Sequence, residues 1–209
     1  MLFRSVLVKI KAKLENGEPA RNADLTDDEK KIASSLFLIT TKPVIYACNI
    51  AESDLGKNED DIKFVKDVKE FAKKEGSEVL VISAKVEQEL TELDDDEKQM
   101  FLEDLGLKES GLDRIIQIGY RLLGQISFLT AGEKEVRAWT ILKGSKAPQA
   151  AGKIHTDFEK GFIKAEVVPY ETLVEYGNYQ AAKEAGKVRI EGKDYVVQDG
   201  DVMLFRFNV

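Results

Sequence analysis

The chain has 209 residues, of which 43% are hydrophobic and 33% charged, and its formal net charge is -7 at neutral pH. This length leaves room for one large core or two small ones, and no apolar run approaches the length needed to cross a membrane. One cysteine and one histidine exclude an internal disulfide and an ordinary structural zinc site. Residues 126–209 hold 12 basic and 12 acidic side chains, so the acidic excess lies before them. This balance argues against strong nonspecific binding to nucleic acid.

The N-terminal segment predicts two helices. A loose alternation of apolar and basic residues over 6–16 stops at Asn16-Gly17, where we expect a helix to end. Thr26 is followed at the third position by Glu29, the pattern of a capping box, and predicts a helix over residues 27–37.

Two continuous apolar runs, residues 44–48 and 78–82, flank an amphipathic stretch that ends at Gly76. Such runs are typical of parallel strands covered on both faces, and a helix between them predicts a right-handed crossover unit. Cys48 lies inside the first run, where a small buried residue is favoured over a redox switch. The helix is expected to bury a stripe made of Ile62, Phe64, Val65, Val68, Phe71 and Ala72.

Both strands run into polar corners. The first is followed by Asn49-Ile50-Ala51-Glu52 and the second by Ser83-Ala84-Lys85. Ligands of open parallel sheets lie beyond the carboxyl ends of the strands, so we expect the two corners to share one site.

The segment after the second corner predicts further helices. Residues 86–93 are short and acidic, and Asp94 to Asp96 precede a helix over 97–105 that ends at Gly106. The acidic triplet suits a helix N-terminus, which is favoured over a metal site. A further amphipathic helix over 112–123 ends at Gly124, where we expect a boundary.

The remaining residues predict several short strands around one main helix, an α+β arrangement of ubiquitin-like, β-grasp type. The strands are expected over 125–130, 135–142, 162–168, 187–190, 195–197 and 202–207, the main helix over 148–159, and short helices over 170–176 and 179–185. Turns are expected at 191–193, as a hairpin, and at 199–201. Candidates for the inner face of the sheet are Ile126, Phe128, Val136, Ala138, Val202, Leu204 and Phe205 or Phe207.

Two side chains in this part invite a functional interpretation. His155 could act as a general base, but no serine or cysteine nucleophile stands near it in sequence, and a packed or capping role is favoured. Trp139 is expected in the core rather than stacked on a nucleic-acid base. A basic face could form from Lys143, Lys146, Lys153 and Lys160, although a merely solvated surface is the commoner case.

The two corners resemble the base-recognition pair of P-loop GTPases, whose first motif is usually Asn-Lys-x-Asp. An aspartate there accepts hydrogen bonds from guanine, whereas adenine lacks the 2-amine and offers an acceptor at N1, so the carboxylate would stay unpaired. The longer Glu52 weakens the case for strict guanine specificity, and Asn49 suits either purine. Asn-x-x-Glu resembles the variant of the YchF family of Obg-like ATPases.

The resemblance to YchF proteins covers roughly residues 14–209. It extends to the sequences Gly111-Leu-Asp-Arg-Ile-Ile-Gln-Ile-Gly-Tyr120, Phe128-Leu-Thr-Ala-Gly-Glu-Lys-Glu-Val-Arg-Ala-Trp-Thr140, the run from Ala147 to Phe162, and Gly192-Lys-Asp-Tyr-Val-Val-Gln-Asp-Gly-Asp-Val202. It implies the end of a helical hairpin and a connecting helix over residues 1–33, the back half of a P-loop G domain over 34–123, and a TGS domain over 124–209.

The resemblance also implies a function. It implies a cytoplasmic, ribosome-associated hydrolase that binds ATP, or GTP, with magnesium in the complete protein. The base would be held by Asn49, Ile50, Glu52, Ser83, Ala84 and Lys85. No Gly-x-x-x-x-Gly-Lys-Ser/Thr phosphate loop occurs in these 209 residues, so we expect no hydrolysis by them alone. The alternative is a non-enzymatic module whose TGS-like part docks on the ribosome, RNA or a protein.

Overall fold

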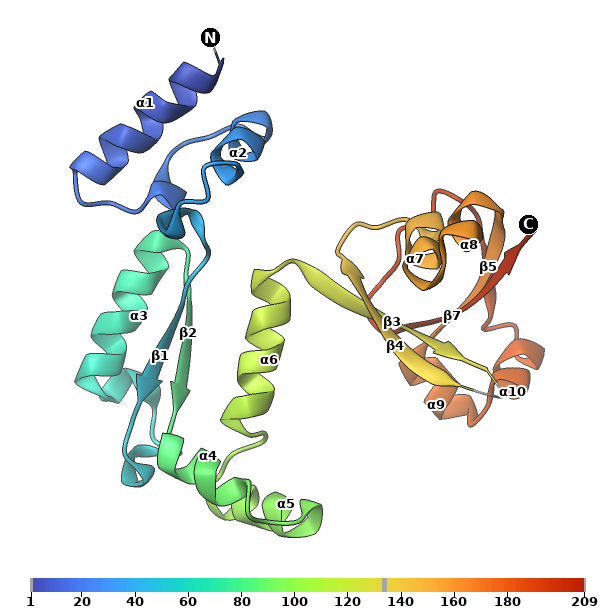
Figure 1. Cartoon of the computed structure of the whole chain (residues 1–209). Helices are drawn as coiled ribbons and strands as arrows, with labels where there is room; N and C mark the ends of the chain where they lie inside the picture. The colour runs from blue at the N-terminus through green and yellow to red at the C-terminus, as the bar shows by residue number, and fades with distance from the viewer. Residues whose placement is uncertain (1, 133–134, 209) are drawn as a thin grey trace. The chain divides into compact units, whose positions relative to one another are not determined.

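The computed structural model describes residues 2–132 and 135–208 and divides into two compact units, Met1–Ile118 and Gly119–Val209. Figure 1 traces both units, which are described separately below. Together they form a mixed α/β fold, with a two-stranded sheet in the first unit and a five-stranded sheet in the second. Within the described residues, no helix is both long and apolar enough to cross a membrane.

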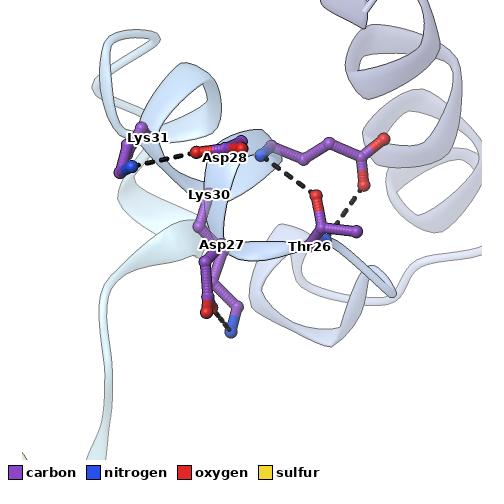
Figure 2. A network of polar contacts seen from close by, with 6 residues as sticks. Thr26, Asp27, Asp28, Lys30 and Lys31 are labelled. Atoms are coloured by element: carbon purple, nitrogen blue, oxygen red, sulfur yellow. Dashed lines mark hydrogen bonds and ion pairs between the residues drawn. The ribbon is translucent and has the colours of Figure 1, made fainter.

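The first unit begins with two helices, α1 (Leu2–Glu15) and α2 (Asp27–Ser34), joined through the short 3-10 helix η1 (Ala20–Asn22). The predicted capping box is confirmed, because the Thr26 hydroxyl accepts from the Glu29 N–H and the Glu29 carboxylate accepts from the Thr26 N–H. Figure 2 shows this cap beside the exposed pairs Lys30–Asp27 and Lys31–Asp28. The Lys9 ammonium lies 2.7 Å from the Glu29 carboxylate and joins α1 to α2.

Both helices differ from their predicted bounds. Helix α1 begins at Leu2, before the expected start at residue 6, because Val6 and Ile10 supply the buried contacts and the preceding turn simply extends the helix. Helix α2 ends at Ser34, before the expected end at residue 37. The chain turns there, and Phe37 adopts a positive φ of 50°, which a helix does not allow.

The central unit of strand, helix and strand forms, but the expectation that both strands are covered on both faces is wrong for β1. None of its residues is buried and Cys48 is half-buried, because the sheet has only two strands. Strands β1 (Ile45–Asn49) and β2 (Glu78–Ile82) are parallel, with Asn49 opposite Ile82, and α3 (Lys63–Glu75) connects them. Gly76 ends the helix in a left-handed conformation, at φ 68°. Short 3-10 helices lie on either side of β1, η2 (Ile39–Thr41) before it and η3 (Glu52–Asp54) and η4 (Glu59–Asp61) after it.

A half-buried ion pair connects the N-terminal helices to this sheet. The Arg21 guanidinium of η1 lies 2.9 Å from the Glu75 carboxylate, which also accepts a 2.8 Å hydrogen bond from the Tyr46 hydroxyl of β1. These two donors, Arg21 foremost, lower the pKa of Glu75.

The predicted apolar stripe of α3 is buried only in part. Val65 and Ala72 are buried, whereas Phe64 is 78% exposed and Phe71 is 52% exposed. The β1–β2 sheet has only two strands and covers a narrow band of α3, so the outer residues of the apolar stripe stay exposed. The Phe71 ring still meets the Tyr46 ring edge-on, with centroids 5.8 Å apart.

Three helices follow β2: α4 (Ala84–Leu90), α5 (Asp95–Asp104) and α6 (Gly111–Leu122). Helix α4 lies where the sequence predicts only a short acidic segment. The capping interpretation of Asp94 is confirmed, because its carboxylate accepts from the Glu97 N–H at 2.9 Å and Glu97 returns the bond. No group of three potential metal-binding side chains is present among the residues the structure describes.

In the second unit the strands lie in the order β4-β3-β7-β5-β6. They are β3 (Gln125–Ala131), β4 (Val136–Leu142), β5 (Phe162–Pro169), β6 (Arg189–Glu191) and β7 (Asp201–Phe207), and the helices are α7 (Ala147–Ile154), α8 (Thr156–Lys160), α9 (Tyr170–Tyr176) and α10 (Tyr179–Glu184). Strands β3 and β7 are parallel, and the other neighbouring pairs are antiparallel. Helices α7 and α8 lie on one face of this sheet and α9 and α10 on the other (Figure 1). Because side chains alternate across the sheet, Phe128 packs with α7 and Leu129 with α9 and α10.

The prediction of inner-face residues for this sheet is wrong at several positions. Ile126, Phe128, Val202 and Phe205 are buried, but Val136 is 74% exposed, and Ala138 and Leu204 are also exposed. In β4, Trp139 and Ile141 face the main core instead, paired with Phe128 and Ile126 of β3.

The remaining differences concern the ends of elements. The main helix is two helices that meet at His155, whose ring nitrogen accepts from the Asp157 N–H, so the capping role is confirmed. In place of the predicted strand over 195–197 there is a single bridge between Lys146 and Val196. The expected hairpin at 191–193 is absent, and β6 pairs with β5 instead.

Candidate functional site

The two polar corners meet at the carboxyl ends of the parallel strands, as the topology requires. Asn49 is the last residue of β1 and lies opposite Ile82, the last residue of β2. The Ile50 N–H extends the pairing by donating to the Ile82 carbonyl at 2.8 Å. The side chain of Asn49 and the start of α4 are therefore held next to each other by backbone pairing.

One hydrogen bond joins the two predicted motifs directly. The Asn49 side-chain oxygen accepts from the Ala84 backbone N–H at 2.9 Å. This bond leaves the amide nitrogen of Asn49 as the group that can donate to a ligand.

The charged members of the two motifs form an ion pair. The Lys85 ammonium lies 2.8 Å from the Glu52 carboxylate, and Glu89 approaches the same ammonium at 3.6 Å. The hydrogen bond to Glu52 raises the pKa of Lys85. The side chains are 69% and 42% exposed, so this pair stabilises the fold only slightly. Its consequence is chemical, because the Glu52 carboxylate is already paired with a cation.

A pocket of about 400 Å³ opens at this corner. Of the six predicted residues, Asn49, Ile50, Glu52, Ser83 and Lys85 line it, and Ala84 reaches it through the hydrogen bond to Asn49. Ala51 and Ser53 also line it. These two were missed, although their position inside or beside the Asn-x-x-Glu motif is the signal that could have found them.

A second set of contacts, not predicted from the sequence, joins α6 to α4 and β2, the elements on either side of the second corner. The Glu87 carboxylate of α4 accepts from the N–H groups of Gly111 and Leu112 at 2.7 and 3.1 Å, capping α6. Arg114 of the same helix donates to the Val81 carbonyl at 3.0 Å. A Cβ on Gly111 would lie 2.6 Å from the Ile82 side chain, so only glycine allows this close approach.

Comparison with known proteins places the fold in a class. The chain superposes on the YchF GTPase of Schizosaccharomyces pombe with a TM-score of 0.82 and 38% identity, over 97% of this chain and 53% of that one. A GTP-binding protein from Pyrococcus horikoshii, at 20% identity and a TM-score of 0.56, shares the fold. The fold is thus that of a YchF-type mixed α/β protein.

The sequences agree with that class. The chain is 52% identical over 204 residues to the ribosome-binding ATPase YchF of Bacillus subtilis, covering 98% of this chain and 56% of the relative. The corresponding protein of Escherichia coli O157:H7 is 50% identical over 205 residues, covering 98% and 55%. The family model YchF-GTPase_C, described as a protein of unknown function, matches residues 125–208.

The chain belongs to the YchF family, and its sequence matches the C-terminal part of the family. It spans about half the length of the curated relatives it matches.

Proposed function

We propose that the first unit supplies the base-binding half of an adenine-nucleotide site, within a ribosome-associated ATPase of the YchF type. The proposal rests on one observation, the hydrogen bond between Asn49 and Ala84 that joins the two motifs at the mouth of a pocket. In the proposed complex, Asn49 donates its amide N–H to N7 of the purine, Ile50 contacts the face of the base, and Ser83 closes the pocket. The ribosome association comes from the names of the relatives.

The Glu52–Lys85 pair supports adenine over a strict requirement for guanine. A guanine would need an unpaired carboxylate to accept its ring N–H and 2-amine, and the Glu52 carboxylate already lies 2.8 Å from a lysine. Binding guanine through Glu52 would first require that pair to break. Adenine has no donor that requires the Glu52 carboxylate, so the Glu52–Lys85 pair persists when adenine binds. GTP is therefore the weaker ligand in the proposal.

The proposed site holds only the base. The magnesium ion that the family resemblance implies for the complete protein has no cluster of carboxylates to hold it within residues 2–132 and 135–208. Phosphoryl transfer depends on charge placed around the phosphates. We therefore propose that these 209 residues bind the nucleotide without hydrolysing it, as the partial G domain of residues 34–123.

The test is calorimetric titration of the chain with ATP and separately with GTP, both with magnesium. ATP is expected to bind more tightly than GTP, and Asn49→Ala is expected to weaken ATP binding by about tenfold through the lost amide donor. The matched control is Asn58→Ala, because Asn58 lies in the same unit but caps η4 outside the pocket. Equal ATP binding by Asn49→Ala and the unchanged chain would refute the proposed contact.

A second candidate function is favoured by the separate core of residues 119–209. The strand order, with β3 and β7 parallel at the centre and α7 on one face, supports assignment of this unit as a β-grasp TGS domain. In this proposal the unit docks on the ribosome or its RNA, and the first unit is a passive remnant. Cosedimentation of the chain with ribosomal subunits at low salt tests it, and its absence there would count against docking.

A further inference from the structure

The second unit contains a pocket that none of the preceding functions uses. It has a volume of about 370 Å³ and lies between the β3–β4 pair, the following turn and α7. Its polar lining comes from Gln125, Thr140, Ser145, Gln149 and Lys153. Helix α7 packs against β4, which holds the two sides of the pocket together.

The hydrogen bonds already present decide what the pocket can offer to a ligand. The side-chain oxygen of Gln149 accepts from the Lys146 N–H at 2.8 Å, which leaves its amide nitrogen to donate. The Thr140 hydroxyl shares a 3.1 Å hydrogen bond with the Tyr120 hydroxyl. The side chains of Gln125 and Ser145 make no hydrogen bond with any residue that the structure describes, so both remain available.

The one charged side chain that lines the pocket is a lysine, although the Glu159 carboxylate lies next to Gly152 at its border. Lys153 lines it, and no aspartate or glutamate does. Lys146, at the start of α7, is paired with Asp194 at 2.7 Å. Lys153 has no such partner among the described residues, so it is the lining cation that can meet an anion.

We propose that this pocket binds a phosphate group. A phosphate presents several oxygen acceptors in different directions. The pocket presents an ammonium and a carboxamide N–H one turn apart on α7 and a hydroxyl from the turn before that helix. In the proposed complex the Lys153 ammonium faces the phosphate charge, and the Gln149 amide nitrogen and the Ser145 hydroxyl donate to its oxygens. The site lies within the second unit and does not depend on the base-binding corner.

General electrostatic attraction does not account for such binding. Residues 126–209 carry equal numbers of basic and acidic side chains, so this stretch has no overall positive field to collect anions. Affinity for phosphate should therefore depend on the pocket lysine and not on lysines elsewhere in the unit.

The test follows backbone amide signals of the full-length chain by NMR during addition of inorganic phosphate. Signals of Ser145, Gln149 and Lys153 are expected to shift, and Lys153→Met is expected to weaken the apparent affinity by about tenfold. Lys187→Met is the matched control, since Lys187 is also an unpaired lysine of this unit among the described residues but does not line the pocket.

Gln149→Glu is a second and sharper variant. A glutamate keeps the oxygen that accepts from the Lys146 N–H, so the start of α7 is preserved, but it replaces the donating nitrogen with a negative oxygen. Phosphate binding should then be lost while the remaining signals stay in place. Unchanged affinity in both Lys153→Met and Gln149→Glu, or shifts confined to other residues, would overturn the proposal.

Two further titrations separate the sources of the phosphate. A nucleoside monophosphate represents small phosphorylated molecules, and a short single-stranded RNA represents nucleic acid. If the RNA is the ligand, the slope of log affinity against log salt should fall by about one in Lys153→Met. If only the monophosphate and inorganic phosphate shift the pocket signals, the ligand is a small molecule.

Discussion

The two units of the chain bury their apolar side chains differently. In the second unit, strands β3, β4, β5 and β7 and helix α7 share one continuous core around Phe128, and a smaller cluster lies under α9 and α10. In the first unit, the buried side chains form separate small groups, one between α1 and α2 and another between α4 and α5. Large apolar side chains stay exposed in both units, for example Phe64 in the first and Val136 in the second, so it is the division of the core that differs.

This difference shows that the number of strands in a sheet limits the size of the core that it can support. Five strands with helices on both faces bury side chains in two layers, whereas two strands offer one narrow band. Because its core is larger and continuous, the second unit should be the more stable one.

The largest expected effect tests whether the units unfold separately. Phe128→Ala removes a fully buried ring from the main core and should destabilise the second unit by about 3–5 kcal/mol. Leu80→Ala, at a 1% exposed position of β2, should cost the first unit about 2 kcal/mol, because its thin surroundings can collapse into the cavity. Urea unfolding followed by fluorescence of Trp139, the single tryptophan, reports on the second unit, and circular dichroism reports on both.

The expectation of separate unfolding is wrong if Leu80→Ala lowers the urea midpoint measured by Trp139 fluorescence as much as Phe128→Ala does. That result would mean that the units unfold as one cooperative block.

A smaller effect is expected in α6, whose two glycines, Gly111 and Gly119, form a matched pair. Gly111→Ala would push a Cβ against Ile82 and Glu87 and should destabilise the first unit by about 1–3 kcal/mol. Gly119→Ala meets no atom within 4 Å and should stabilise the helix by about 0.5–1 kcal/mol. Thermal unfolding by circular dichroism measures both, and a loss in Gly119→Ala equal to that in Gly111→Ala would contradict the packing argument.

The smallest expected effect concerns acid sensitivity of the second unit. The Glu166 carboxylate, whose side chain is 10% exposed, accepts from the Tyr179 hydroxyl at 2.6 Å and lies 3.2 Å from Arg206 and 3.4 Å from Lys183. These donors, Tyr179 foremost, lower the pKa of Glu166. The ionised form is thus favoured by folding, so its contribution is present above the ordinary glutamate pKa of about 4.3 and is lost as the pH falls through the lowered value.

Glu166→Gln should remove this part of the acid dependence. At neutral pH the variant should lose about 1 kcal/mol, and the difference from the unchanged chain should shrink as the pH falls. Urea midpoints from Trp139 fluorescence across that pH range measure it. A difference that stays constant down to acid pH would assign the loss to packing instead of charge.

Local signals in the sequence were enough for the elements that carry their own pattern. The apolar runs predicted β1 and β2, the Thr26 and Asp94 caps marked the starts of α2 and α5, and Gly76 marked the end of α3. The meeting of the two corners follows from the parallel pairing of Asn49 with Ile82. The residue roles at this corner stay predictions that the nucleotide titrations test.

Other features depend on partners distant in sequence. The hydrogen bond from the Gly111 N–H to the Glu87 carboxylate joins residues 24 positions apart. No local sequence pattern around either residue predicts it. The facing of β4 was wrong because helices cover both faces of the five-stranded sheet, so apolar residues on either face look equally buried. Helix α4 begins without a side-chain cap and spans only seven residues, which leaves little for a sequence pattern to detect.

The hydrogen bond from Ala84 to Asn49 has a consequence for how the corner can be observed. Ala84 is the first residue of α4, where backbone amides normally lack a helical partner and exchange quickly with deuterium. Because the Asn49 oxygen accepts from this N–H at 2.9 Å, the amide should be protected before any ligand arrives. A nucleotide that took over the same N–H would leave its exchange rate nearly unchanged, so the side-chain amide protons of Asn49 are the ones whose signals should register occupancy.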